Sequence, residues 1–391
     1  MSKSDRDTDH RVPPRSHARF RNRVSSRAWL GTAAVTALVL AGGASLAFAS
    51  IGGSSSLAKQ IAALLHSPTT INQKVPLKHK PPAHGEIDFI GGTAPQVTSL
   101  FDGVKAAGAA LGWTVREIPG YNESDPASYV AALDTALQHK PVAVIETAGV
   151  PESEWAQVLP AYKAAHTVIV PAFGTGTPSS VVTTSIPSTQ TESSFGVAVA
   201  KWVAYQADGQ AKKIMLWDIP AFTSEPPFVS GFEQTLAQYC SACTVTPETT
   251  TLGEFTAGTT ASVIVSALRQ TNYNYFVSAW GEGSAQVSAQ LGPAGITGLT
   301  IASNSCDTIN EAGILNGTEA LCTAYPYQIA GWIAVDTVLR RIEKMNIPSG
   351  DGGFPAVHLL TSANESSWSP GDSLDQPINY PEQFKKLWHV K

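Results

Sequence analysis

The chain has 391 residues, of which 43% are hydrophobic and 15% are charged, a balance that excludes general disorder and is enough for two folded domains. Its net charge of −5 is unevenly distributed, because residues 1–27 carry eight Lys or Arg and three Asp, which leaves −10 for the remainder. A body of that charge lacks the basic footprint of nucleic-acid-binding proteins, so we expect no nucleic-acid partner.

An uncharged apolar segment follows the basic tail. Residues 29–48 are rich in Ala, Leu and Val and are long enough to span a bilayer once. Positive charge ahead of such a segment stays inside the cell, so residues 1–27 are expected to be a cytoplasmic tail. Two interpretations of residues 28–50 are open: a cleaved signal peptide ending near Ala47-Phe48-Ala49, or an uncleaved transmembrane anchor. Both place the following residues outside the cytoplasm, in the periplasm or at the cell surface.

Residues 51–85 are expected to be a flexible linker. Gly52-Gly53 and the three serines after them are typical of a flexible segment, and residues 67–84 are polar, interrupted by Pro, and without an apolar period. His66, His79 and His84 lack the regular spacing of metal ligands, so no metal site is expected there.

The first half of the folded region alternates strands with helices. The strand Glu86–Ile90 stops at Gly91-Gly92, and a helix with apolar residues at three-to-four spacing runs from Pro95 to Leu111. The same pattern predicts the strands Trp113–Ile118, Val142–Ile145 and Thr167–Val170, helices ending near His139 and spanning Glu152–Ala165, and a fifth strand at Val181–Ile186. Such alternation predicts a doubly wound parallel sheet.

After Pro187 the pattern begins again. Helices are predicted at Thr189–Ala207, Pro226–Tyr239, Thr259–Gln270 and Ser284–Leu291, and strands at Lys212–Asp218, Cys243–Pro247, Tyr275–Ala279 and Leu299–Ser303. This is a second α/β domain of the same build. Two halves of similar size in an exported chain predict two lobes that face each other across a cleft.

A last strand and helix connect the halves. The strand Ala320–Ala324 leads through Tyr325-Pro326-Tyr327 into a helix with Ile329 and Trp332 on its apolar side. With these residues, the order of elements from Glu86 to about Leu360 resembles the type I periplasmic binding proteins, in particular the ribose-like sugar-binding branch that serves ABC transporters.

The resemblance implies a clamp with three hinge crossings, near Ile186–Thr189, Ala324–Pro326 and Pro355–Val357. One lobe would comprise residues 86–187 and 325–355, and the other residues 188–324 and 356–391. It implies that one small solute binds between lobes that close over it, without a cofactor. We expect a monomer that works with an ABC permease.

The candidate ligand-binding residues are those that follow each strand, because ligands bind at the carboxyl edges of open parallel sheets. Trp280, directly before Gly281, is ranked first, since a ring at that position suits a cleft better than a core. The full set is Thr93, Ala94, Pro95, Glu146, Thr147, Phe173, Asp218, Phe222, Trp280, Glu282, Asn304 and Tyr325.

Three positions depart from the pattern of the sugar-binding family. No Arg lies ahead of Gly231-Phe232, where sugar binders carry one, and Ala279-Trp280 stands where they commonly show Asn-Asp. Asn304 replaces an acidic residue. Fewer fixed donors and more aromatic surface favour a solute that is less hydroxylated than a pentose, or partly aromatic or apolar, with a sugar kept as the broadest expectation.

Four cysteines fall into two close pairs. In an exported chain an even count predicts disulfides, and we expect Cys240–Cys243 and Cys306–Cys322. A redox role for the first pair is weakly supported, because it follows a helix end instead of opening a helix. A four-cysteine zinc site would require both pairs to meet in space.

No catalytic motif is present, so no catalytic or metal-ligating residue is proposed. The chain contains no Gly-x-Ser-x-Gly elbow, no His-Glu-x-x-His and no Gly-x-Gly-x-x-Gly at a helix start, which argues against an enzyme. Two functions remain. The protein captures a solute for an ABC importer, or it is a membrane-anchored ligand sensor that passes its closed state to a partner receptor.

Overall fold

The computed structural model describes residues 47–122, 125–147, 150–174, 176–347, 353–367 and 374–391. The basic tail and most of the proposed signal or anchor segment therefore lie outside the described residues. Among the helices of the described part, none combines the length and the apolar character needed to cross a membrane.

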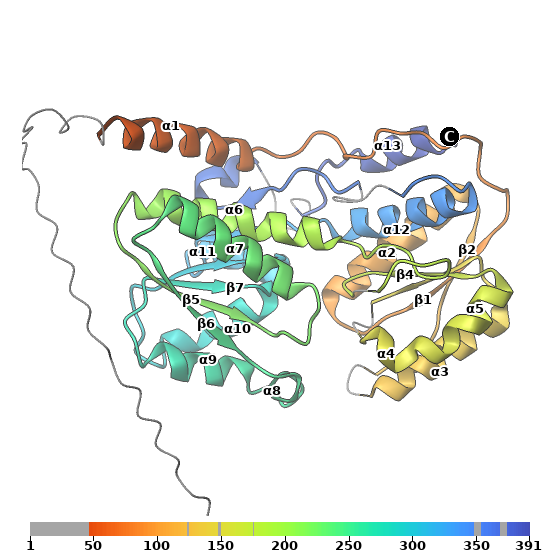
Figure 1. Ribbon diagram of the computed structural model, residues 1–391, viewed down its shortest axis with the longest axis horizontal. Coiled ribbons are helices and arrows are strands. Elements are labelled where there is room, and N and C mark those ends of the chain that lie inside the picture. The colour runs from red at the N-terminus through yellow and green to blue at the C-terminus, as the bar shows by residue number, and fades with distance from the viewer. Residues whose placement is uncertain (1–46, 123–124, 148–149, 175, 348–352, 368–373) are drawn as a thin grey trace, which may run out of the picture. The chain divides into compact units, whose positions relative to one another are not determined.

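The first half of the folded region forms a four-stranded parallel sheet in the order β2-β1-β3-β4 (Figure 1). Its strands are β1 (Glu86–Ile90), β2 (Thr114–Glu117), β3 (Ala143–Glu146) and β4 (Val168–Pro171). The helices between them are α2 (Pro95–Leu111), α3 (Pro126–His139), α4 (Glu152–Trp155) and α5 (Leu159–Ala165). This confirms the predicted parallel α/β arrangement.

Two details of this half differ from the prediction. Residues 181–186 form isolated bridges with β4 and the residue after it, not a strand, because the Ser179 hydroxyl accepts the N–H groups of Val181 and Val182 and holds a turn there. The helix expected at residues 152–165 is divided into α4, a 3₁₀ turn at Ala156–Val158, and α5. Pro160 explains the break, since a proline lacks the N–H that a continuous helix needs.

The second half forms a six-stranded sheet in the order β10-β9-β8-β7-β5-β6. Every strand is parallel to its neighbours except β10, which runs antiparallel to β9. The strands are β5 (Lys213–Asp218), β6 (Thr244–Thr249), β7 (Tyr275–Ser278), β8 (Thr300–Ser303), β9 (Leu321–Thr323) and β10 (Leu359–Leu360). The helices are α6 (Thr189–Ala207), α7 (Glu225–Tyr239), α8 (Leu252–Thr256), α9 (Thr260–Leu268), α10 (Gly281–Leu291) and α11 (Thr308–Asn316).

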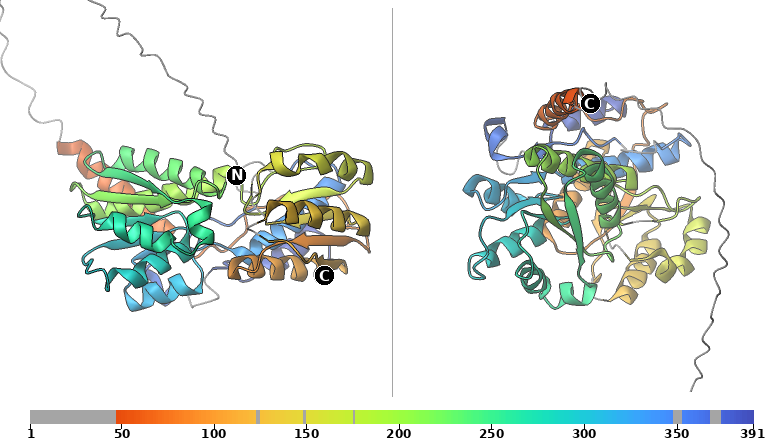
Figure 2. Two further views of the ribbon diagram at one scale, coloured as in Figure 1. Left: turned by 90° about the horizontal axis from the view of Figure 1, so that it is seen from below. Right: turned by 60° about the vertical axis from the view of Figure 1, so that its left-hand side comes forward.

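Glycines allow two pairs of helices to pack at close range (Figure 2). Helix α12 (Tyr327–Ile342) lies against α2, and a Cβ at Gly103 or Gly331 would collide with the backbone of the partner helix. Gly196 and Gly231 play the same part between α6 and α7. The contact between α2 and α12 thus holds the segment that follows β9 against the first half of the fold.

The expected flexible linker is instead packed on the folded body, which corrects that prediction. Helix α1 (Ala47–Leu64) opens the described chain, and Leu57, Ile61, Ile71 and Leu77 are buried in the main hydrophobic core. The Leu77 N–H donates to the carbonyl of Leu387 at 2.9 Å, so this segment is also held by the last helix. We call residues 56–85 the N-terminal strap. Leu57 and Ile61 are one turn apart in α1, whereas the spacing of Ile71 and Leu77 shows no period that would predict their burial.

The C-terminal residues return to the first half, which corrects the predicted domain boundary. Helix α13 (Tyr380–Leu387) packs on α12, and the Trp388 ring stacks on Trp332 with centroids 5.2 Å apart. The Asp375 carboxylate accepts the N–H groups of Gln328 and Ile329 at the start of α12, at 2.9 and 3.1 Å. Of the second predicted lobe's tail (residues 356–391), β10 belongs to the six-stranded sheet, whereas residues 374–391 pack beside α12.

Candidate functional site

The first-sheet candidates lie in two neighbouring loops. Thr93, Ala94 and Pro95 connect β1 to α2, and Thr93 and Pro95 are exposed. Glu146 ends β3 opposite Ile90 and is buried, and the Thr147 N–H donates to the Ile90 carbonyl at 3.0 Å. These bonds hold the loops after β1 and β3 side by side, as the topology of parallel strands requires.

Aromatic side chains gather at the carboxyl edge of the six-stranded sheet. The Trp280 ring centroid lies 6.3 Å from that of Phe222 and 5.3 Å from that of Phe255, and the two phenylalanine rings are 5.1 Å apart. All three rings are partly exposed. The buried Trp217 ring packs against Trp280 from the core side, with ring centroids 6.2 Å apart. We call Phe222, Phe255 and Trp280 the aromatic platform.

Phe255 was missed by the sequence analysis because α8 was not predicted. The signal was present as a capping box, in which Thr251 and Glu254 exchange hydrogen bonds at the start of α8. Glu282, a predicted ligand-binding residue, is half-buried in the first turn of α10. This helix begins directly after Trp280.

Asp218 ends β5 and is a buried carboxylate without a hydrogen-bonding partner. The residue is 7% exposed, and among the described residues no hydrogen bond or ion pair to its side chain is found. Burial raises the pKa of Asp218 to about 6, and the negative charge of Glu233 on α7 adds to the shift. Phe222 lies on the same β5–α7 loop, so this loop combines a carboxylate with an aromatic ring.

Asn304 and Tyr325 lie deeper than their predicted roles suggested. Asn304, after β8, is 2% exposed, accepts from the Thr323 hydroxyl at 2.6 Å, and hydrogen-bonds Glu192 on α6. Burial raises the pKa of Glu192 to about 8. The Tyr325 hydroxyl is fully covered and has no hydrogen-bonding partner among the described atoms, although it interacts electrostatically with Glu192.

Phe173 and Tyr325 join the ends of the two sheets. Phe173 follows β4, Tyr325 follows β9, and their ring centroids are 5.6 Å apart. Phe195, Tyr327 and Phe354 pack around Tyr325 at 5.6, 4.6 and 5.9 Å. These two predicted ligand residues therefore belong to an aromatic cluster between the sheets, in which Tyr325 is buried and Phe173 is partly exposed.

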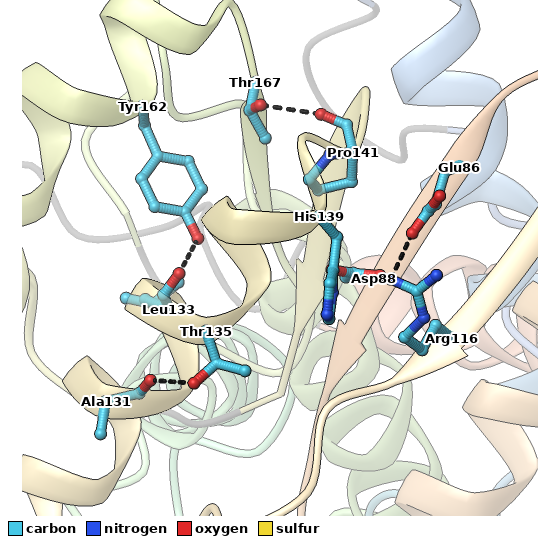
Figure 3. A network of polar contacts seen from close by, with 10 residues as sticks. All are labelled: Glu86, Asp88, Arg116, Ala131, Leu133, Thr135, His139, Pro141, Tyr162 and Thr167. Carbon is cyan, nitrogen blue, oxygen red and sulfur yellow. Dashed lines mark hydrogen bonds and ion pairs between the residues drawn. The ribbon is translucent and has the colours of Figure 1, made fainter.

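A charged network occupies the opposite end of the first sheet (Figure 3). His139 Nδ1 lies 2.8 Å from Asp88 Oδ2, and Arg116 forms an ion pair with Glu86 and lies 3.7 Å from Asp88. Glu86, Asp88 and His139 are close enough together to hold a metal ion. Arg116 already supplies positive charge to both carboxylates, so the network is explained as an ion-pair cluster that braces β1, β2 and α3.

A groove in the second half lies away from the predicted ligand residues. This groove of about 560 Å³ lies between α1 and α6, and its walls include Ile61, Trp202 and Tyr205. Tyr275 and Thr300, which also line it, are the first residues of β7 and β8. The groove is therefore at the amino edge of the second sheet, and no candidate ligand residue lines it.

The cysteines pair as predicted, Cys240 with Cys243 and Cys306 with Cys322. The Cα–Cα distances are 5.3 and 5.7 Å, within the range of disulfides. The second pair ties the loop after β8 to β9, next to Asn304 and the connection to α12.

We predict that the denatured, unreduced protein contains no free thiol and that reduction exposes four, as measured by thiol titration. Reduction of the longer bridge should lower the free energy of unfolding by about 3 kcal/mol, since it releases a loop of roughly 15 residues. A thiol count of four before reduction would contradict both bridges, and a count of two would contradict one of them.

Comparisons with known proteins agree with this geometry. The model of a family described as "Periplasmic binding protein domain" matches residues 92–344. No curated protein matches the chain.

Several solved structures share the fold. An ABC transporter solute-binding protein from Burkholderia graminis C4D1M in complex with D-arabinose has a TM-score of 0.62 at 16% identity, over 76% of this chain and 100% of that one. The arabinose-binding component from Shewanella sp. ANA-3 has a TM-score of 0.60 at 17% identity, over 74% and 98%. A periplasmic solute-binding protein from Actinobacillus succinogenes 130z with bound D-allose has a TM-score of 0.61 at 14% identity, over 73% and 100%.

Proposed function

Since this chain belongs to the family of proteins with a periplasmic binding protein domain, we propose that it captures a small solute outside the cytoplasm and delivers it to an ABC importer. Membership of a family of binding proteins agrees with the absence of catalytic motifs from the sequence. The four-stranded sheet with α12 and α13 would form one lobe, and the six-stranded sheet the other.

The observation that carries this proposal is the contact between Phe173 and Tyr325. It brings together the residues that follow β4 in one sheet and β9 in the other, with ring centroids 5.6 Å apart. Carboxyl edges are where open parallel sheets bind ligands, so a solute held near this contact would touch loops of both sheets. Closure of the lobes would then remove water from both faces of the solute.

A sugar-like solute is the expected class. The solved structures of similar fold contain D-arabinose and D-allose, and an aromatic platform suits the apolar face of a sugar ring. The residues before Gly231-Phe232 contain no Arg, so polar recognition here would depend on Asp218, Asn304 and the loops of the first sheet. This supports a solute with fewer hydroxyl contacts than a pentose makes through a bidentate arginine.

The test is a thermal-shift and calorimetry screen of residues 56–391 against pentoses, hexoses, polyols, aromatic acids and nucleosides. A true ligand at 100 times its Kd should stabilise the native state by about 2.7 kcal/mol and raise Tm accordingly. A neutral salt at equal ionic strength controls for non-specific effects. A screen in which no solute shifts Tm or gives heat of binding would contradict the proposed function.

A further inference from the structure

The loops at the proposed binding edges contain no positively charged side chain. Lys, Arg and His are absent from the segments that follow the nine parallel strands, residues 91–94, 118–125, 147–151, 172–188, 219–224, 250–251, 279–280, 304–307 and 324–326. The opposite edges differ, since Lys140, His166 and Lys212 lie just before β3, β4 and β5. Arg341 on α12 donates to the Ser179 carbonyl in the segment after β4, but none of these segments carries a basic side chain of its own for an anionic solute.

Three buried carboxylates lie at the edge of the second sheet without a basic partner. Asp218, Glu192 and Glu225 are 7%, 3% and 5% exposed, and within the described chain none forms an ion pair with Lys, Arg or His. Electrostatic interactions link Glu225 to both of the others, so the three are neighbours. Buried charges in proteins are normally paired or bind a cation, so this set needs an explanation.

Two of the three need no cationic partner. Burial raises the pKa of Glu192 to about 8, so this carboxyl is largely protonated at neutral pH, and burial raises the pKa of Glu225 as well. Glu225 also accepts the Ile219 N–H at 2.6 Å. Asp218 lies at the end of a strand and not at a helix start. Within the described part of the chain its carboxylate thus has neither a hydrogen bond nor an ion pair.

One other feature at this edge favours a cation. The β5–α7 loop that begins after Asp218 carries Phe222 of the aromatic platform, and aromatic faces attract ammonium groups when water is excluded. The cation would therefore meet a carboxylate and an aromatic ring on the same loop.

We propose that the solute carries a protonated amine together with hydroxyl groups, as amino sugars and amino polyols do, and that Asp218 accepts the ammonium group beside the aromatic platform. This inference rests on the proposed function and specifies the ligand of the same site. The ammonium supplies the positive charge that the buried carboxylate lacks. The hydroxyl groups follow from the sugar-like class of the proposed solute.

The pH dependence follows from the buried carboxylate. Burial and Glu233 raise the pKa of Asp218 to about 6, and Glu225 of the same helix α7 also interacts with it. An ammonium binds the ionised form, so affinity for an amine should rise with pH through this range and binding should release protons below it. A neutral sugar should show neither effect.

The test is calorimetry of the full chain with glucose, galactose and mannose and with the 2-amino and 2-acetamido derivative of each. An amine should bind about 30-fold more tightly than its neutral counterparts, the effect of completing a buried charge pair. Its measured enthalpy at pH 5.5 should depend on the ionisation enthalpy of the buffer, because protons are released. If a neutral sugar or polyol binds and no amine exceeds it, the inference fails while the proposed function stands. If neither these compounds nor the wider screen gives binding, the proposed function fails as well.

Asp218→Asn keeps the size of the side chain and removes its charge. It should weaken amine binding by about 30-fold and remove the proton release at pH 5.5. Glu233→Gln is the matched control, since Glu233 is exposed and acts on Asp218 only electrostatically. It should leave amine affinity at pH 8 unchanged. If Asp218→Asn and the unaltered protein bound the amine equally tightly, Asp218 would not be the acceptor of the ammonium group. Proton release by the unaltered protein tests the same assignment without any variant.

Discussion

A chain that begins at Glu86 is expected to be far less stable than one that begins at Ser56, although residues 56–85 precede the first strand that the sequence predicts. The strap between them buries Leu57, Ile61, Ile71 and Leu77 in the main core. Full burial of such side chains contributes about 2 kcal/mol each, so the total approaches the whole stability of an ordinary domain. We therefore expect the shorter chain to be insoluble or to melt more than about 10 °C lower.

Hydrogen bonds lost with the strap add to this effect. Arg340 is 1% exposed, pairs with Asp336 at 2.6 Å, and donates to the Val75 carbonyl at 2.7 Å. Without the strap this buried guanidinium would lose one acceptor and part of its cover, which is costly for a charged group.

Calorimetric melting of the two chains checks the prediction, and one matched pair of point variants refines it. Leu77→Ala removes a side chain that is 3% exposed and should cost about 3 kcal/mol, whereas Val75→Ala alters one that is 56% exposed and should cost little. Equal melting temperatures for the chains that begin at residues 56 and 86 would show that the strap does not stabilise the fold.

Replacement of Trp280 by Ala is expected to remove most of the affinity for the solute. Trp280 contacts both other rings of the aromatic platform and is partly exposed, so it presents the largest apolar face at the candidate site. Loss of a central aromatic contact in a desolvated site costs about 2 kcal/mol, which is roughly a 30-fold weaker Kd.

Controls separate this binding effect from a loss of stability. Trp280→Phe keeps a ring at the position and should retain affinity within about fivefold, since stacking depends on the aromatic face. Tyr205→Ala truncates a ring that is 43% exposed on α6 and lines the groove at the amino edge of the second sheet, so it should not change the Kd. Titration calorimetry with the best ligand of the screen measures all three. Full affinity in Trp280→Ala would remove this residue from the site.

Local pattern was enough to predict most of the fold. The periodicity of α2, with its proline start and its glycine end in the left-handed conformation, predicted the helix bounds of Pro95–Leu111 directly. Short elements were harder to predict. Helix α8 has only five residues, too few for a periodic pattern, and its capping box is the main sign of it in the sequence. The bridges at residues 181–186 were read as a strand, since alternation alone does not reveal that Ser179 holds a turn.

The candidate site was predictable in part. The rule that ligands bind after the strands of a parallel sheet selected Asp218, Phe222 and Trp280, which lie at the carboxyl edge of one sheet. The rule could not separate partly exposed side chains from buried ones. It therefore predicted that Tyr325 and Asn304 line a cleft, although these residues are 1% and 2% exposed. Burial depends on which helices cover an edge, and that is decided by contacts between distant segments.

The sequence by itself determined that the chain has two α/β halves, a charged tail before an apolar segment, close cysteine pairs and no catalytic motif. Each of these follows from local periodicity, spacing or composition. Only the tertiary structure decided that residues 56–85 belong to the fold, that α13 returns to α12, and that Asp218 is buried without a partner. The physical reason is the same in each case. Burial and pairing are properties of contacts between segments far apart in the chain, and no local pattern encodes whether an apolar or charged side chain will find its partner there.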